Sequence, residues 1–316
     1  MPLSQAYDAA LLDLDGVLYL GPDPVPHAAE AVAAARAGGM RAAFVTNNAS
    51  RRPAAVARHL VELGIAAEPG DVVTSAQAAV RWLTARLAPG SAVLVVGTAD
   101  LAEEVTAGGL RPVRQAEGAV AVIQGLDLST GWRDLAEASV AIRAGALWVA
   151  GNADSTYPSS RGPLPGNGAF VQALVSATGL HPVVVGKPEP ELHAASVERV
   201  RALRPLVVGD RLDTDILGAV RAGSDSLLVL TGVTDREQLL AAPPGSRPSY
   251  VSSDLRGLGL AHAQPVVHGP TARCGGATAS YEGTRLVTVG EGDDALRAAC
   301  ALAWSHGDAD AQRDPR

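Results

Sequence analysis

The stretch LLDLDGVLY, residues 11–19, decides how this sequence is interpreted: an apolar run of strand length ends in Asp13 and Asp15. Three further stretches have the same form, an apolar run that ends in polar residues: AFVTNNAS (43–50), VVVGKPEP (183–190) and LVVGDRLDTDI (206–216). In parallel α/β sheets, ligands bind beyond the carboxyl ends of the strands. The residues directly after these four runs are therefore the candidates for chemistry.

The rest of the chain repeats an alternation of short Val-, Leu- and Ile-rich runs with Ala-rich stretches of helical length. This pattern is typical of βαβ units and predicts an α/β fold with a Rossmann-like parallel-sheet core. Strands are expected at residues 9–13, 40–46, 92–96, 120–124, 146–150, 182–185, 206–209, 226–230 and 250–252. A leading proline and a trailing glycine mark helices that begin at Pro26 and Pro53.

The spacing of the motifs predicts the domain organisation. Asp15 and Thr46 are 31 residues apart and Lys187 and Asp210 are 23 apart, about one strand–helix unit each, whereas 141 residues separate Thr46 from Lys187. The excess of roughly 100 residues is enough for a domain of its own. We expect a core of residues 1–81 and 183–260, an inserted α/β domain (82–182) that acts as a lid, and a C-terminal extension (261–316) with two strands, one of them at 285–289, and a helix near 294–303.

Composition excludes several classes of protein. With 316 residues, 47% hydrophobic and 19% charged, the chain is that of an ordinary folded protein. A net charge of −7 and an aromatic content of 3% argue against nucleic acid as a partner. The N-terminus has acidic residues inside its apolar run, so we expect no signal peptide, and glycines and prolines interrupt the uncharged stretch 162–186, so no membrane span is expected. We expect a cytoplasmic protein, and the sequence leaves a homodimer open.

Two residue types outside the motifs receive structural interpretations. Cys274 and Cys300 have no paired spacing and are expected to be buried free thiols. Trp82, Trp132 and Trp148 fall in the inserted segment, where core packing is favoured over substrate stacking.

Lysine usage points to one position. Of the 26 basic residues 25 are arginine, and the lone lysine is Lys187. Guanidinium is a wide fork, whereas ammonium is a compact charge that fits against one phosphate oxygen or between carboxylates. Chance in an arginine-biased composition is the alternative, but the neighbouring motif favours a site that needs the smaller cation.

The acidic residues at the strand ends predict a metal ion. Asp13 and Asp15 have period two at the end of one strand, so their carboxylates point to the same side, and Asp210 and Asp215 come from another strand end. Against one lysine these four acids leave a charge of about −3, which a small cavity cannot hold uncompensated. The ligands are all hard oxygens, so Mg²⁺ is the expected cofactor.

A divalent cation, a lysine, a threonine hydroxyl and backbone N–H groups together suit a dianionic phosphate. In such a site a carboxylate can act as a nucleophile and form an aspartyl-phosphate, while a second acid protonates the leaving oxygen and later activates water. Each motif also has a simpler interpretation. Thr46, Asn47 and Asn48 could form an ordinary turn, and helix capping is favoured for Asp213.

In their order along the chain, D-L-D-G-V-L, V-T-N-N, G-K-P and G-D-R-L-D-T-D-I resemble the motifs of the haloacid dehalogenase-like phosphohydrolases. Over residues 7–258 the chain looks most like the 4-nitrophenylphosphatase-like branch with a C2-type cap, and the segment 151–169 resembles the exit of such caps. The C-terminal extension is similar to that of actinobacterial members that look like glycerol-3-phosphate phosphatases.

The resemblance implies a role for each acid. Asp13 would be the nucleophile and a metal ligand, and Asp15 the general acid/base that also gives its backbone carbonyl to Mg²⁺. Asp210 would be the third protein ligand, and Asp215 would support the metal site or pair with Lys187.

It also implies that Thr46, Asn47, Asn48 and Lys187 bind the phosphoryl group, and that Lys187 orients Asp13. The expected activity is that of a phosphoric monoester hydrolase acting on a small phosphorylated metabolite, glycerol 3-phosphate or 2-phosphoglycolate first. Sugar phosphates, nucleotides and pyridoxal phosphate are alternatives. From another class, a receiver-like signalling module that keeps the phosphoryl group is the alternative, although the large insert and the position of Asp13 after the first strand argue against it. A non-catalytic phospholigand-binding protein fits poorly, because every motif has its reactive residue.

Overall fold

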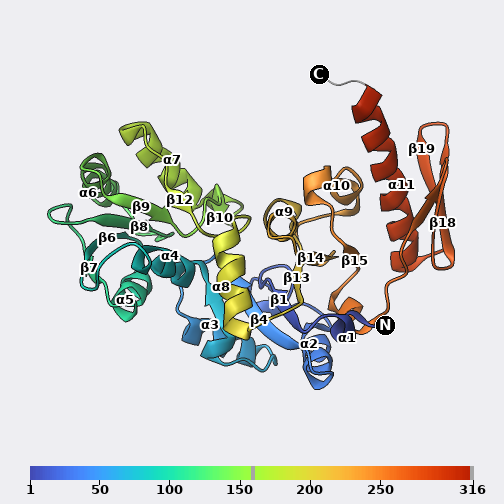
Figure 1. Cartoon of the computed structure of the whole chain (residues 1–316), viewed down its shortest axis with the longest axis horizontal. Helices are drawn as coiled ribbons and strands as arrows, with labels where there is room; N and C mark the ends of the chain where they lie inside the picture. Colours follow the sequence, from blue (N-terminus) through green and yellow to red (C-terminus); the bar gives the residue numbers. More distant parts are fainter. Residues whose placement is uncertain (158–160, 314–316) are drawn as a thin grey trace. The chain divides into compact units, whose positions relative to one another are not determined.

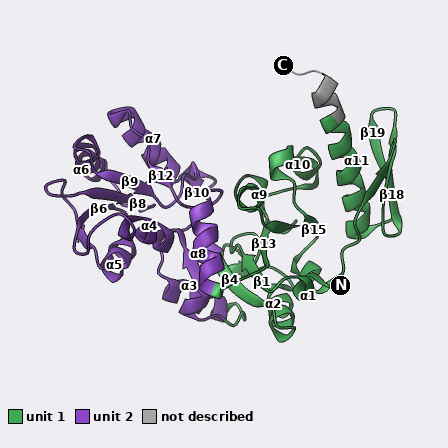
Figure 2. Ribbon diagram, viewed as in Figure 1, with its two compact units in different colours: residues 1–44, 62–66, 200–316 green, residues 45–61, 67–199 purple. Residues whose placement is uncertain are grey.

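The computed structural model describes residues 1–157 and 161–313, with side chains described as far as residue 308. The chain divides into two compact units (Figure 2). Unit 1 contains residues 1–44, 62–66 and those from 200 onward, and unit 2 contains residues 45–61 and 67–199. Parallel strands followed by helices form the framework of both units (Figure 1).

Unit 1 contains five strands of a six-stranded sheet, paired in parallel in the order β15-β14-β13-β1-β4. These strands are β1 (Ala9–Leu12), β4 (Arg41–Thr46), β13 (Pro205–Gly209), β14 (Asp225–Val229) and β15 (Tyr250–Ser252). All residues of β1 are buried, which explains its uninterrupted apolar sequence. In this sheet Leu12 pairs with Val208 of β13 and with Phe44 of β4. The residues that follow β1 and β13 therefore leave the sheet side by side.

Helices and short turns connect these strands. A small hairpin of β2 (Tyr19–Leu20) and β3 (Asp23–Pro24) follows β1 directly. The helices around the sheet are α1 (Leu3–Ala6), α2 (Ala28–Ala37), α9 (Leu217–Arg221) and α10 (Arg236–Leu240). Between β13 and α9 lies one π-helical turn, Leu212–Ile216. Such turns are rare in helices and are frequent at functional sites.

The C-terminal extension is an antiparallel sheet covered by one helix. Its strands are β16 (Val266–His268), β17 (Thr271–Cys274), β18 (Ala277–Glu282) and β19 (Arg285–Val289), followed by α11 (Gly292–Arg313). On one side α11 packs Ala298, Ala299 and Leu302 against β17 and β18. Through Leu296 and Cys300 it packs against Leu228 and Val251 of the parallel sheet. The extension thus shares a core with unit 1.

Unit 2 contains a second parallel sheet, with the order β12-β9-β8-β6-β7. Its strands are β6 (Ala92–Val96), β7 (Arg111–Val113), β8 (Ala121–Gln124), β9 (Leu147–Ala150) and β12 (Val183–Val184). The helices are α3 (Pro53–Glu62), α4 (Ser75–Thr84), α5 (Ala99–Ala107), α6 (Trp132–Arg143), α7 (Asn167–Thr178) and α8 (Pro190–Val200). Strand β5 (Val72–Thr74) precedes α4, and β10 (Thr156–Tyr157) pairs with β11 (Leu164–Pro165). Lys187 follows β12, so it stands at the carboxyl end of this sheet.

The α/β prediction is confirmed, and all nine expected strands are present with ends shifted by at most two residues. β5 and β7 were not expected. The extension has four strands, so the expectation of two was wrong. Its helix α11 extends to Arg313, well beyond the expected end near residue 303. Strand β19 matches its expected bounds.

The cysteine prediction is confirmed, and the tryptophan prediction only in part. Cys274 and Cys300 are buried free thiols, and burial raises their pKa values to about 11 and about 12. Trp148 is buried, but Trp132 is 80% exposed at the start of α6. In the described part of the chain no helix is both long enough and apolar enough to span a membrane.

Candidate active site

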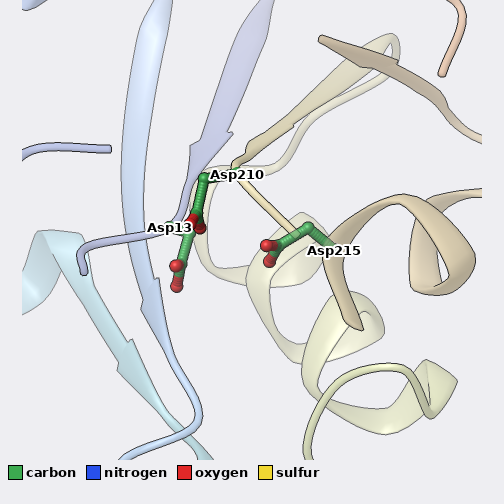
Figure 3. Close-up of side chains that lie close together, drawn as sticks. All are labelled: Asp13, Asp210 and Asp215. Carbon is green, nitrogen blue, oxygen red and sulfur yellow. The ribbon is translucent and has the colours of Figure 1, made fainter. Parts of the chain in front are cut away.

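Three carboxylates meet at the carboxyl ends of two neighbouring strands of unit 1. Asp13 follows β1, Asp210 follows β13, and Asp215 lies in the π-helical turn after it (Figure 3). One oxygen atom from each carboxylate lies within 4.8 Å of the others. Asp210 and Asp215 are buried and Asp13 is half-buried. The sequence predicted that acidic residues meet at these strand ends. Asp215, which was expected to support the metal site or to pair with Lys187, is one of the three clustered acids.

The loop after β14 fixes the position of Asp210. Its Oδ2 atom accepts a hydrogen bond from the backbone N–H of Val233 at 2.6 Å, and its backbone carbonyl accepts one from Thr234 at 3.1 Å. At Gly16 and Gly232 any Cβ atom would overlap the Asp210 carboxylate. Gly16 also has a φ of +82°, which favours glycine independently. The two glycines therefore make the space that a buried carboxylate occupies.

Asp215 is held by its own turn. The backbone N–H of Arg211 donates to its Oδ2 atom at 3.2 Å, and a Cβ atom at Gly209 would overlap its side chain. Asp213, two residues before Asp215, is exposed and forms an ion pair with Arg211 at 2.8 Å. Hydrogen bonds from the Arg211 guanidinium lower the pKa of Asp213. Asp213 was expected to cap a helix, but its carboxylate instead accepts hydrogen bonds from the Arg211 guanidinium, and it is not one of the three clustered acids.

Asp15 is exposed and lies in the tight turn that joins β1 to the β2–β3 hairpin. In this turn Gly16 donates its N–H to the Tyr19 carbonyl at 2.8 Å. The hydroxyl of Thr231 donates to the Gly16 carbonyl at 2.5 Å. The loop after β14 therefore holds both Asp210 and the turn that carries Asp15. The Asp15 carboxylate is not among the three that lie within 4.8 Å of one another.

Unit 2 contains the other predicted residues, beginning with the turn after β4. Thr46 is buried, and its Oγ1 atom accepts a hydrogen bond from the N–H of Asn48 at 3.0 Å. The Oδ1 atom of Asn48 accepts hydrogen bonds from the N–H and the hydroxyl of Ser50 at 2.7 and 2.6 Å. The side-chain carbonyl of Asn48 thus shapes the turn.

Asn47 and Lys187 are brought together across 140 residues of sequence. The Oδ1 atom of Asn47 accepts the N–H of Lys187 at 2.7 Å, and its Nδ2 atom donates to the Lys187 carbonyl at 3.0 Å. The Lys187 ammonium donates to the Val45 carbonyl at 3.4 Å. The Asn47 carboxamide therefore connects two of the four motifs. From the sequence, Asn47 was expected to bind the phosphoryl group.

The acidic cluster of unit 1 has the chemistry of a hard-cation site. Buried like charges this close cannot all stay ionised without compensation. Every cluster donor is a carboxylate oxygen, and such donors select Mg²⁺ or Ca²⁺ over softer metals. The glycines beside Asp210 keep side chains out of the space around it. The residues present therefore fit a hard divalent cation.

The sequence patterns did not predict a role for the loop after β14. Thr231, Gly232 and Val233 hold Asp210 and the Gly16 turn, yet none of them carries a charge. A signal was present, because the loop follows the expected strand 226–230 and lies at the same edge of the sheet as the motifs after β1 and β13. Considering every strand end, and not only the charged ones, would have found it.

Comparison with known proteins defines the class of the chain. Residues 10–111 match the model of the haloacid dehalogenase-like hydrolases, and residues 184–258 match a second model, described as HAD-hydrolase-like. Together these segments contain the four motifs. The chain belongs to the haloacid dehalogenase-like hydrolase family, which confirms the family prediction and the prediction of a phosphoric monoester hydrolase.

Named relatives narrow the group. The chain is 54% identical over 257 residues to D-glycerol 3-phosphate phosphatase of Mycobacterium tuberculosis, covering 81% of this chain and 72% of that one. It is 36% identical over 251 residues to an acid sugar phosphatase of Staphylococcus saprophyticus, covering 79% and 95% of the two chains. Among solved structures, glycerol phosphate phosphatase from M. tuberculosis in complex with magnesium matches with a TM-score of 0.84 and 44% identity, over 99% of this chain and 98% of that one.

The space beside Asp210 leads to a first prediction. Gly232→Ala should displace the Asp210 carboxylate, because the new methyl group would overlap it and approach the Gly16 Cα atom. We expect the affinity for Mg²⁺ or Ca²⁺, measured by calorimetric titration, to fall at least ~10-fold, the effect of about 1.4 kcal/mol.

The matched control is Gly245→Ala, because a Cβ atom at Gly245 has nothing within 4 Å. This variant should bind the cation as the unchanged protein does. Equal affinities in the two variants would contradict the assigned role of Gly232.

Proposed function

We propose that the protein is a Mg²⁺-dependent phosphatase that hydrolyses glycerol 3-phosphate, with 2-phosphoglycolate as the next candidate, through an aspartyl-phosphate on Asp13. The observation that carries this proposal is the cluster of Asp13, Asp210 and Asp215 at the ends of adjacent strands. The 54% identity to D-glycerol 3-phosphate phosphatase of M. tuberculosis supports the substrate.

Asp13 and Asp210, with the backbone carbonyl of Asp15, would hold Mg²⁺, and Asp215 would support them. The solved relative in complex with magnesium supports this choice of metal. When bound, the ion neutralises the carboxylates and the phosphoryl oxygens, so that an anionic nucleophile can approach an anionic substrate. The cradle at Gly16 and Gly232 keeps Asp210 in place for this task.

In the first step an oxygen atom of Asp13 attacks phosphorus. A bond forms between that oxygen and phosphorus, while the bond from phosphorus to the ester oxygen breaks. The leaving oxygen takes a proton from the carboxyl group of Asp15, so glycerol departs as a neutral alcohol. The exposure of Asp15 supports this role, because the same group must later meet water.

In the second step the Asp15 carboxylate takes a proton from water. The water oxygen attacks phosphorus of the aspartyl-phosphate, the bond from phosphorus to Asp13 breaks, and inorganic phosphate leaves. Asp13 is again a carboxylate and Asp15 is again protonated, so the cycle closes. Thr46 and Lys187 bind phosphoryl oxygens in both steps, with help from the backbone at Asn47 and from Asn48.

We also propose the domain roles. Residues 82–182 would form a C2-type cap that supplies the contacts with the organic part of the substrate, and residues 1–81 and 183–260 would form the core. Strand β12, at the start of the second core segment, pairs with β9 of the cap segment, and Lys187 comes three residues after it. Residues 261–316 would be an extension that stabilises the core through α11.

The substrate assignment predicts a ranking. In a phosphate-release screen over phosphorylated metabolites with Mg²⁺, glycerol 3-phosphate should give the highest kcat/KM. The acid sugar phosphatase relatives make sugar phosphates the second candidate class. A sugar phosphate, a nucleotide or pyridoxal phosphate at the top of the ranking would contradict glycerol 3-phosphate and leave the phosphatase activity intact.

The nucleophile assignment predicts that Asp13→Asn releases no detectable phosphate from 4-nitrophenyl phosphate. Uncatalysed monoester hydrolysis is extremely slow, with enzymatic accelerations of up to ~10²¹-fold, so loss of the nucleophile abolishes turnover. Near-normal activity of this variant would refute the role of Asp13. If the unchanged protein instead kept a stable aspartyl-phosphate without multiple turnovers, a receiver-like module would be the correct class.

The lone lysine leads to a further prediction. Lys187→Arg keeps the positive charge but replaces a compact ammonium with a wide fork, which misplaces the charge against the phosphoryl oxygens. We expect kcat/KM for 4-nitrophenyl phosphate to fall at least ~10²-fold. Arg86→Lys is a control, because Arg86 is exposed and its guanidinium contacts the Trp82 ring and carbonyl. A mild loss in Lys187→Arg, equal to that control, would argue against a need for lysine.

A further inference from the structure

We infer that Ser75 and Asn152 are positioning residues, which hold the backbone of Asn47 so that its side chain fixes Lys187. Neither residue belongs to the four strand-end motifs, although Asn152 lies in the segment 151–169 that resembles a cap exit, and neither was predicted to contact substrate. The inference deepens the proposed function and rests on it for its kinetic consequences. The hydrogen bonds on which it is based all lie within unit 2 and do not depend on the proposed function.

The starting point is the backbone carbonyl of Asn47. The hydroxyl of Ser75 donates to this oxygen at 2.6 Å, and the Nδ2 atom of Asn152 donates to it at 2.8 Å. A carbonyl oxygen has two lone pairs, so these two donors saturate it. Ser75 is fully buried and Asn152 is 5% exposed. Water therefore cannot replace either donor readily, and the carbonyl has one allowed position.

The side chain of the same residue continues the network. It accepts the N–H of Lys187 and donates to the Lys187 carbonyl, which fixes that backbone in both directions. We call the set of Asn47, Ser75, Asn152 and the Lys187 backbone the Asn47 latch. Gly186 packs so closely that a Cβ atom there would overlap the Gly151 carbonyl and lie 2.7 Å from Asn47 Oδ1. The absence of a side chain at Gly186 thus leaves room for the Asn47 carboxamide beside the Lys187 backbone.

The members of the latch come from the ends of four strands. Asn47 follows β4, Ser75 follows β5, Lys187 follows β12, and Asn152 comes two residues after β9. Gly151, between β9 and Asn152, donates its N–H to Gln124 of β8 at 2.8 Å, and Val185, two residues before Lys187, donates to Ala150 of β9 at 3.1 Å. The strand framework therefore delivers all four residues to one point.

This arrangement matters because a lysine has a flexible four-carbon stem. The charge of such a side chain is placed accurately only if its backbone is fixed, since free rotamers would spread it over several positions. Thr46 precedes Asn47 directly, so the latch also restrains the turn in which the threonine hydroxyl accepts the Asn48 N–H. One carbonyl oxygen with two donors thereby positions two groups that the proposed function assigns to the phosphoryl group.

The test compares Ser75→Ala with Ser196→Ala. Ser196 is also fully buried, and its hydroxyl donates to the Leu192 carbonyl at 2.8 Å within α8, so each variant loses one equivalent buried hydrogen bond. Both should lower the unfolding temperature similarly. Ser75→Ala alone should lower kcat/KM for 4-nitrophenyl phosphate and raise Ki for inorganic phosphate, each by about 5- to 10-fold, as expected for about one lost hydrogen bond. Equal kinetics in the two variants would overturn the inference.

A double-mutant cycle tests the shared acceptor. Asn152→Ala and Ser75→Ala each leave one donor on the Asn47 carbonyl, whereas the double variant leaves none. Its loss in kcat/KM should exceed the product of the single losses by at least ~3-fold, because residues that share a partner are coupled. Independent, multiplicative losses would contradict a common latch.

A third measurement does not need activity. Hydrogen exchange of the Lys187 amide, followed by mass spectrometry on peptides that cover 183–190, should be faster in Ser75→Ala than in Ser196→Ala. If the unchanged protein releases phosphate from no metabolite in the screen while this difference holds, the proposed function fails and the latch stands. If turnover is normal and exchange is equal in both variants, the latch fails alone.

Discussion

The mutual repulsion of the carboxylates of Asp13, Asp210 and Asp215 is the constraint on which unit 1 depends. Three acids whose oxygens lie within 4.8 Å, two of them buried, destabilise the fold unless a cation compensates them. The chain accepts this cost at the carboxyl ends of β1 and β13, where the strand order of the sheet makes the following residues neighbours. Groups of the protein itself also stabilise the cluster. Backbone N–H groups of Val233 and Arg211 donate to Asp210 and Asp215, and glycines keep side chains away.

Unit 2 solves the opposite problem, the placement of a single cationic side chain. Lys187 is the one lysine of a sequence with 25 arginines, and the side-chain carboxamide of Asn47 holds its backbone through two hydrogen bonds. The contrast with the arginines is physical. Arg41 and Arg211 are partly exposed and have local acceptors, such as Asp8 and Asp213, that suit a fork. An ammonium group on a fixed backbone instead presents one compact charge, which is the form of charge that a phosphoryl oxygen requires.

The sequence allowed the strands and the motif residues to be predicted, because buried parallel strands have uninterrupted apolar runs and their ends carry the polar residues. Asp13, Asp210, Asn47 and Lys187 were all found in this way. What escaped prediction has weaker patterns. β5 is three residues long, Thr231 and Gly232 carry no charge, and Ser75 and Asn152 act through a backbone carbonyl that any residue would provide. Trp132 shows the converse error, since an apolar residue in an α/β segment need not be buried if it begins a helix at the surface.

The residues that escaped prediction share one property: each acts on the backbone of a motif and not on its chemistry. Thr231 donates to the carbonyl of Gly16, which follows Asp15, and Ser75 donates to the carbonyl of Asn47, which follows Thr46. In both units a hydroxyl at the end of one strand thus fixes the turn at the end of another. A charged group is only as well placed as the turn that carries it, so the accuracy that phosphoryl transfer demands must come from such contacts. Their hydrogen-bonding partner is a carbonyl common to every residue, which is why position on the sheet, and not residue type, identifies them.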